Sequence, residues 1–248
     1  MRSKISGVGG VCLLIVFLLA SVVYAEEETF ICGVAQGYPP YQFVGADGTS
    51  TGLDVEVIRL VFEKMGRDLT VRQDNWDDIV AGLRLGKLDC IAGMEINERR
   101  NKFFDFTSPY YSRKGMIFVL ADSFVHSFSE LQWQVVTGDR DSYVEEFFRE
   151  KGVHRHIRLY QTKSKEQSME MLKQGKAVAA IAPKAVGVFL ACKYDVDVRM
   201  IDVGDPGVPV GIAVAKGNRT LLMQMEAALN ALVDEGALQE VLKRWQTP

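Results

Sequence analysis

Two consecutive arginines, Arg99 and Arg100, follow the mostly apolar run LDCIAGM at residues 88–94, which is typical of a buried strand. A guanidinium group is planar, keeps its positive charge and can donate two parallel hydrogen bonds to a carboxylate. An aromatic segment, FDFTSPYY at residues 104–111, comes shortly afterwards. The pattern therefore indicates one of two things: the arginines make the end of a core strand soluble, or an anion binds there.

Aromatic side chains also gather in two other predicted loops, with Tyr38 and Tyr41 in GYPPYQF and Trp76 in NWDD. Tyrosine and tryptophan offer a large contact area at a small entropy cost, and their rings can receive a cation. Core packing is the more common role of an aromatic residue near a strand end. Two interpretations of these three residues therefore stay open: they line a pocket, or they pack in the core.

The first third of the chain alternates between strand and helix patterns. Residues 29–35, 68–73 and 88–94 have strand-like patterns, while residues 53–65 and 75–86 show the apolar spacing of helices. Gly66 is a suitable end for the first helix and Asn75 is a suitable cap for the second. This β-α-β-α-β order predicts a parallel sheet flanked by helices.

A second alternation follows, and the tail adds one more strand and two helices. We expect strands at 115–121, 133–138, 156–161, 177–183 and 198–204, and helices at 141–152 and 164–175. The tail has a strand at 210–215 and helices with two apolar stripes, which are formed by Leu221, Met225, Leu229 and Leu232 and by Leu238, Val241, Leu242 and Trp245.

The tail is too small to fold alone, so we expect it to pack back on the first α/β unit. This predicts an α/β protein of two lobes with two chain crossings, in which residues 26–113 and 207–248 form lobe 1 and residues 114–206 form lobe 2. Open α/β sheets bind ligands at the carboxyl ends of their strands, so a cleft between the lobes is the expected ligand site. Arg100 and the loops after Val34 and Thr137 lie at such ends.

The N-terminus predicts export. Arg2 and Lys4 precede the apolar run VGGVCLLIVFLLASVV, and small residues precede EEE, which is the pattern of a signal peptide cleaved after Ala25. Loss of residues 1–25 removes two positive charges and no acid, so the formal net charge changes from -3 to -5. Nucleic-acid phosphates require a basic face, so we expect no nucleic-acid partner.

The cysteines and histidines indicate neither a disulfide framework nor a metal site. Cys32, Cys90 and Cys192 remain after export, and three cysteines cannot all pair within one chain. Cys32 and Cys90 lie in apolar runs, so buried thiols are favoured over a disulfide between neighbouring strands. The histidines, which lack metal-ligand spacing and are assigned to the surface, are His126, His154 and His156.

The ordered series of motifs resembles the bacterial extracellular solute-binding proteins of family 3, the polar amino-acid-binding components of ABC importers. The series consists of GYPPYQF, GLDVEV, LRLGKLDCIAGMEINERR, FDFTSPYY, GIAVAKGN and ALNALVDEGALQEVLKRW, and it runs from about Phe30 to Trp245. The resemblance implies a type II periplasmic-binding-protein fold that closes over a small carboxylate-bearing solute. It also implies a periplasmic monomer that serves an inner-membrane permease without a cofactor.

The resemblance implies a role for particular residues. Arg100 stands six residues before Phe106, where the family has the arginine that holds the α-carboxylate. The family positions whose rings line the solute correspond to Tyr38, Tyr41 and Trp76. Gly93 corresponds to a position whose backbone touches the ligand. In lobe 2, Asp141 and Ser142 are the candidates at a helix N-terminus suited to an anion, and plain helix capping is the alternative.

Two residues depart from the family pattern. Pro183 stands where the family has the acid that binds the α-ammonium group, and Glu95 replaces a threonine or serine. Glu95 either neutralises Arg100 and repels an anionic ligand, or takes over the ammonium contact in lobe 1. The ligand is then an amino acid held differently, a non-amino carboxylate, or a cationic or peptide-like solute.

The leading interpretation is a binding protein without catalytic residues, which captures its solute by lobe closure. One alternative is an enzyme that resembles cyclohexadienyl dehydratases, with Glu95 as general acid. The other is a sensor or a degenerate relative without the usual amino-acid ligand, which Pro183 suggests.

Overall fold

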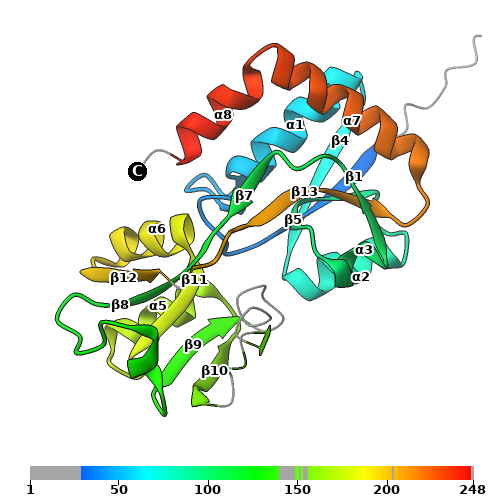
Figure 1. Cartoon of the computed structure of the whole chain (residues 1–248). Coiled ribbons are helices and arrows are strands. Elements are labelled where there is room, and N and C mark those ends of the chain that lie inside the picture. The colour runs from blue at the N-terminus through cyan, green and yellow to red at the C-terminus, as the bar shows by residue number, and fades with distance from the viewer. Residues whose placement is uncertain (1–28, 140–148, 151, 153–155, 203, 247–248) are drawn as a thin grey trace, which may run out of the picture.

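The computed structural model describes residues 29–139, 149–150, 152, 156–202 and 204–246, which build two α/β lobes (Figure 1). This architecture confirms the predicted fold class. The predicted helix at 141–152 lies largely outside the described residues. Within the described ranges, no helix is long and apolar enough to cross a membrane.

The first sheet has the strand order β4-β1-β5-β13-β6, and β7 pairs with the first part of β13 while β6 pairs with its last part. Strands β4, β1 and β5 run parallel, while β13 is antiparallel to its neighbours. The bounds are β1 Phe30–Ala35, β4 Leu69–Asp74, β5 Cys90–Glu95, β6 Phe104–Phe106, β7 Tyr111–Arg113 and β13 Val208–Ala215. A small hairpin, β2 Phe43–Val44 with β3 Ser50–Thr51, stands beside this sheet.

Helices cover both faces of the first sheet (Figure 1). On one face lie α1 Leu53–Met65, α7 Arg219–Asp234 and α8 Ala237–Gln246, and on the other lie α2 Trp76–Arg84 and α3 Glu98–Asn101. The two faces of β13 belong to different core clusters, because Ile212 packs with the first group of helices and Ala213 packs with α2. This alternation is the period of two that a strand buried on both faces requires.

The second sheet has the strand order β10-β9-β11-β8-β12. Its bounds are β8 Gly115–Leu120, β9 Val135–Asp139, β10 Arg158–Thr162, β11 Ala179–Pro183 and β12 Val198–Asp202. Two helices, α5 Lys165–Lys173 and α6 Lys184–Tyr194, pack against it, and a short 3-10 turn spans Phe128–Leu131. Trp133, which we expected at the start of β9, instead has a positive φ of 66° and precedes the strand.

Helix α6 is absent from the sequence-based prediction. Its sequence, KAVGVFLACKY, is apolar on nearly all sides, so it lacks the polar stripe by which a surface helix is recognised. Tertiary packing explains this composition, because Val186 and Leu190 are buried in the core and Gly187 lies against the ring of Phe118.

The chain passes between the sheets twice. It leaves the first sheet at Arg113 and enters the second at Gly115, and it returns between Asp202 and Val208. The buried carboxylate of Asp205 ties the two crossings together, because it accepts hydrogen bonds from the Gly115 amide at 2.7 Å and the Gly207 amide at 2.8 Å. The crossings are therefore held in a fixed relation to each other.

A Gly187→Ala variant tests the close packing of α6. A Cβ at this position would lie 2.0 Å from Cζ of Phe118. We expect a loss of about 1–3 kcal/mol of unfolding free energy from this overpacking, although alanine is the better helix former. Urea denaturation of the variant and the wild type measures this loss.

The matched control is Gly82→Ala in α2, where the nearest atom is the flexible Cδ1 of Leu88 at 3.0 Å. The unfolding free energy of this variant should stay closer to that of the wild type. Equal or greater stability of Gly187→Ala would contradict the packing described here.

Candidate functional site

A cavity of about 1150 Å³ lies between the two lobes. Its wall in the first lobe comes from the loop after β1, the start of α2, the end of β5, and α3. Its wall in the second lobe comes from the loop between β10 and α5, and from α6. The described residues that line it include Tyr38, Gln42, Phe43, Trp76, Gly93, Glu95, Arg100, Arg113, Lys163, Glu166, Pro183 and Phe189. Both lobes therefore contribute polar and aromatic groups to one space.

Arg100 reaches this cavity from α3. Asn97 caps this short helix and accepts a hydrogen bond from the Arg100 amide at 2.9 Å. The Arg100 guanidinium lies 5.2 Å from the centre of the Trp76 ring, and its Nη1 donates to the Glu95 carbonyl oxygen at 2.8 Å. Its Nε and Nη2 donate to no described residue. One edge of the guanidinium is therefore left for a ligand.

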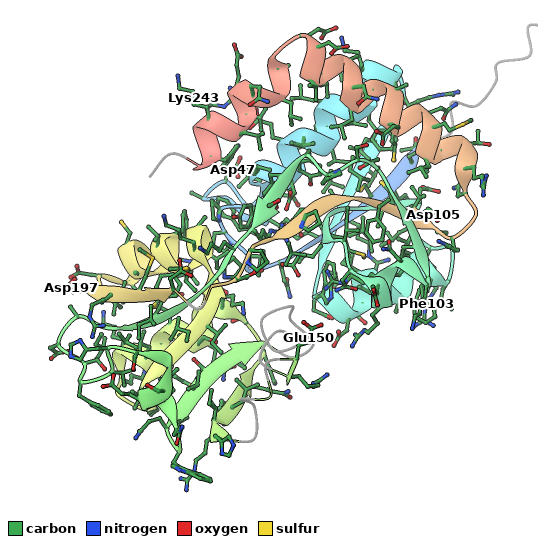
Figure 2. The ribbon with its side chains drawn as sticks, viewed as in Figure 1. Asp47, Phe103, Asp105, Glu150, Asp197 and Lys243 are labelled. Atoms are coloured by element: carbon green, nitrogen blue, oxygen red, sulfur yellow. The ribbon has the colours of Figure 1, made fainter. Side chains whose placement is uncertain are left out.

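Burial lowers the pKa of Arg100, and the nearby Glu95 carboxylate opposes this shift. An arginine nevertheless keeps its charge in a protein. Asp105 is not its partner, because that carboxylate lies on the outer side of the first lobe (Figure 2) and pairs with Lys216 at 2.6 Å. Arg100 therefore does not form an ion pair with Asp105.

Glu95 ends β5 and faces two guanidinium groups. Its Oε2 is 3.5 Å from Nη1 of Arg100, and its Oε1 is 3.8 Å from Nη1 of Arg113. Both contacts are longer than the 2.7–2.9 Å of a strong charge-assisted hydrogen bond. The Glu95 side chain is only 11% exposed and lines the cavity, and the described residues leave most of the hydrogen-bonding capacity of its carboxylate unused.

Arg113 is a second buried guanidinium that the sequence analysis missed. It ends β7, is 5% exposed, and its Nη2 lies 2.6 Å from Oδ2 of Asp54. Its Nη1 donates to the Gly93 carbonyl oxygen at 3.0 Å. The signal that could have revealed this pair is Asp54, an acid between the apolar residues Leu53 and Val55 at the start of α1, to which the sequence analysis assigned no role.

Four donors satisfy the Asp54 carboxylate, which is fully buried. Besides Arg113 these are Gln42 Nε2 at 2.7 Å, the Tyr110 hydroxyl at 2.6 Å and the Tyr111 hydroxyl at 3.2 Å. Burial alone would lower the pKa of Arg113, but the acidic groups around it, Tyr111 and Asp54 foremost, raise it well above its ordinary value. Arg113 is therefore charged, and its nearest counterion is the buried Asp54 carboxylate.

The structure brings together five of the predicted site residues. These residues, which all line the cavity, are Tyr38, Trp76, Gly93, Glu95 and Arg100. Tyr41 does not line it: its ring is 4% exposed, lies 4.4 Å from the Arg113 guanidinium and stacks on Tyr111 at 5.2 Å. Asp141 and Ser142 lie outside the described residues.

Gly93 leaves no room for a side chain. It has a φ of 70°, and a Cβ there would lie 2.0 Å from Oδ2 of Asp54 and 2.2 Å from Nε2 of Gln42. The strand can approach the buried pair this closely only because the residue is glycine.

In the second-lobe wall the sequence analysis had singled out Pro183, but it missed the other lining residues described here. Lys165 is 2% exposed and its Nζ donates to the Ile181 carbonyl oxygen at 3.2 Å. Glu166 lies 3.7 Å from Lys193. The rings of Phe43 and Phe189 meet across the cavity at 5.6 Å, so the two lobes already touch at one side.

An Asp54→Asn variant tests the buried pair. Its amide keeps the shape of the carboxylate but removes the close counterion of the buried Arg113 charge and leaves only the longer contact with Glu95 among the described residues, which we expect to cost about 3–5 kcal/mol of unfolding free energy. Urea denaturation measures the loss. The control is Glu235→Gln, which breaks the exposed pair with Lys64 at 2.7 Å and should cost about 0–1 kcal/mol. Equal losses in the two variants would contradict the role of Asp54.

Tyr41 provides a test by pH. Burial raises its pKa from 10.0 to about 12, against the opposing effect of Arg113. A folded pKa above the unfolded value stabilises the fold at pH below 10.0, and this contribution is lost as the pH rises through about 12. Unfolding free energy should therefore fall more steeply over this range in the wild type than in Tyr41→Phe. If the unfolding free energies of the two proteins changed in parallel with pH, this expectation would be wrong.

Comparison with known proteins places the chain in a family. A curated relative from Escherichia coli (strain K12), "ABC transporter arginine-binding protein 1", is 26% identical over 242 residues, which cover 94% of this chain and 98% of the relative. The solved structure of "An ancestral arginine-binding protein bound to arginine" matches with a TM-score of 0.81 and 25% identity, over 88% of this chain and 97% of that chain.

The same fold occurs in an ancestral amino acid-binding protein described as a precursor of cyclohexadienyl dehydratase. Its TM-score is 0.80 at 23% identity, over 88% of this chain and 95% of that chain. Residues 30–248 match the model of the bacterial extracellular solute-binding proteins, family 3. As its motifs predicted, the chain belongs to this family.

Proposed function

We propose that this protein binds a small carboxylate-bearing solute, an amino acid or a close relative, and delivers it to the permease of an ABC importer. Family membership supports solute capture, and the name of the Escherichia coli relative supports an amino acid. One observation supports a carboxylate group in the solute. Arg100 lines the cavity between the lobes, and its Nε and Nη2 have no partner among the described residues. That edge matches the two oxygens of a carboxylate.

Lobe closure is the proposed mechanism. We take residues 26–113 and 207–248 as lobe 1, residues 114–206 as lobe 2, and the two crossings as the hinge. A solute that contacts both walls binds the closed arrangement more tightly and therefore shifts the population toward it. The contact between Phe43 and Phe189 supports this, because it already bridges the two walls on one side of the cavity.

We further propose that residues 1–25 direct export and that the mature protein works as a monomer in the periplasm without changing its solute. The enzymatic alternative is tested by incubation with prephenate or arogenate. Full recovery of the compound by chromatography supports a binding protein, whereas formation of an aromatic product would establish a dehydratase.

Arg100→Ala should weaken solute binding about 100-fold or more, because it removes two charge-assisted hydrogen bonds from a site largely shielded from water. Isothermal titration calorimetry with the solute identified by mass spectrometry after native purification measures this.

The neighbouring Arg99 is exposed and provides the matched control. Arg99→Ala should change the affinity by no more than about twofold. An unchanged affinity of a folded Arg100→Ala variant would remove the carboxylate anchor from the proposal.

A further inference from the structure

We infer that Glu95 receives the α-ammonium group of an amino-acid solute, so that both charges of the zwitterion are bound by lobe 1. This inference rests on the proposed function and narrows the solute from any carboxylate to an α-amino acid. It also assigns to Glu95 the task for which Pro183 has no suitable group.

Pro183 lines the cavity in the second lobe, where it ends β11. A proline side chain carries neither a negative charge nor a hydrogen-bond acceptor, so it cannot bind an ammonium group. The lining carboxylates among the described residues are Asp77, Glu95 and Glu166. Asp77 is exposed to solvent and Glu166 is near Lys193 at 3.7 Å. Of these three acids, Glu95 is therefore the buried one, and it lies in the first-lobe wall.

Glu95 has room for a donor. Its carboxylate accepts a single hydrogen bond from the described residues, the 3.5 Å contact with Nη1 of Arg100, and its contact with Arg113 at 3.8 Å is an ion pair without a hydrogen bond. An ionised carboxylate offers about four acceptor positions, and leaving them empty in a buried site is costly. An ammonium group carries three donors and would fill this deficit.

The charge balance of the wall decides between a zwitterion and an anion. Arg113 is matched by Asp54 at 2.6 Å, which leaves Arg100 and Glu95 as one positive and one negative group. Apart from the solvent-exposed Asp77, the first-lobe wall is thus neutral. A carboxylate without an ammonium group would add a buried net negative charge beside Glu95, whereas a zwitterion adds none.

The geometry agrees with this assignment. In an α-amino acid the carboxylate and ammonium groups are both bonded to the Cα atom, so their receptors must also be neighbours. The nearest atoms of the Arg100 guanidinium and the Glu95 carboxylate are 3.5 Å apart. The two receptors are therefore placed for a single α-amino-acid head group.

Calorimetry of the mature wild-type protein with the standard L-amino acids and L-cystine identifies the best amino-acid probe. Its analogue without the amino group and its analogue without the carboxylate are then titrated. For L-arginine these are 5-guanidinopentanoate and agmatine. We expect loss of the amino group to weaken binding by about 10- to 100-fold, the range of a hydrogen-bonded charge.

Glu95→Gln should weaken binding of the amino acid by a similar factor, but it should leave binding of the des-amino analogue unchanged or improved. If Glu95 had a merely structural role, Glu95→Gln would weaken the binding of both compounds equally and leave the ratio of their affinities unchanged. The matched control is Glu63→Gln, because Glu63 is exposed on α1 far from the cavity lining. If Glu95→Gln fails to fold, two other measurements test the inference. These are the ratio of the wild-type affinities for the amino acid and its des-amino analogue, and the same ratio in Glu95→Asp, which should keep the preference for the amino acid.

Two outcomes would overturn the inference. One is equal or tighter binding of des-amino carboxylates by the wild type, and the other is a gain of amino-acid affinity in Glu95→Gln. If such carboxylates bind and Arg100→Ala abolishes their binding, the proposed function stands and only the role of Glu95 fails. If neither amino acids nor carboxylates such as succinate bind, the proposed function fails as well.

Discussion

The buried ion pair between Asp54 and Arg113 is the interaction on which the first-lobe wall of the cavity depends. It joins α1 to the end of β7, directly before the chain crosses to the second lobe. Since a buried charge is tolerated only when its partners satisfy it, the pair constrains everything around it. Gln42 must donate to Asp54, and residue 93 must be glycine to let β5 pass.

This pair gives the two guanidinium groups of the wall different tasks. The two Nη atoms of Arg113 donate to Asp54 and to the Gly93 carbonyl oxygen, and its guanidinium lies against the rings of Tyr38 and Tyr41. Arg100 stands nearer the open cavity and keeps one edge for a ligand. Because Asp54 is the close partner of Arg113, Glu95 is the carboxylate that balances Arg100 among the described residues. The electrostatic character of the site therefore follows from a pair that lies below it.

Much of the fold follows from the sequence, because strands and amphipathic helices leave local periodic patterns. The alternation of elements and the return of the tail predicted two α/β lobes, and the structure has them. Helix α6 was missed because it is apolar on nearly all sides and so lacks a local signal. Tyr41 is an aromatic near a strand end whose position, in the core rather than on the cavity, depends on Arg113 far along the chain.

The sequence by itself determined which residue types stand at the strand ends, including Arg100, Glu95 and Pro183, and the family to which the chain belongs. Only the tertiary structure decided which charges meet. Asp54 and Arg113 are far apart in sequence, and their pairing leaves no periodic trace, because it arises where α1 and β7 pack together. Electrostatic interactions fall off with distance in space, so the balance of charge in the cavity could be read only after folding had set those distances.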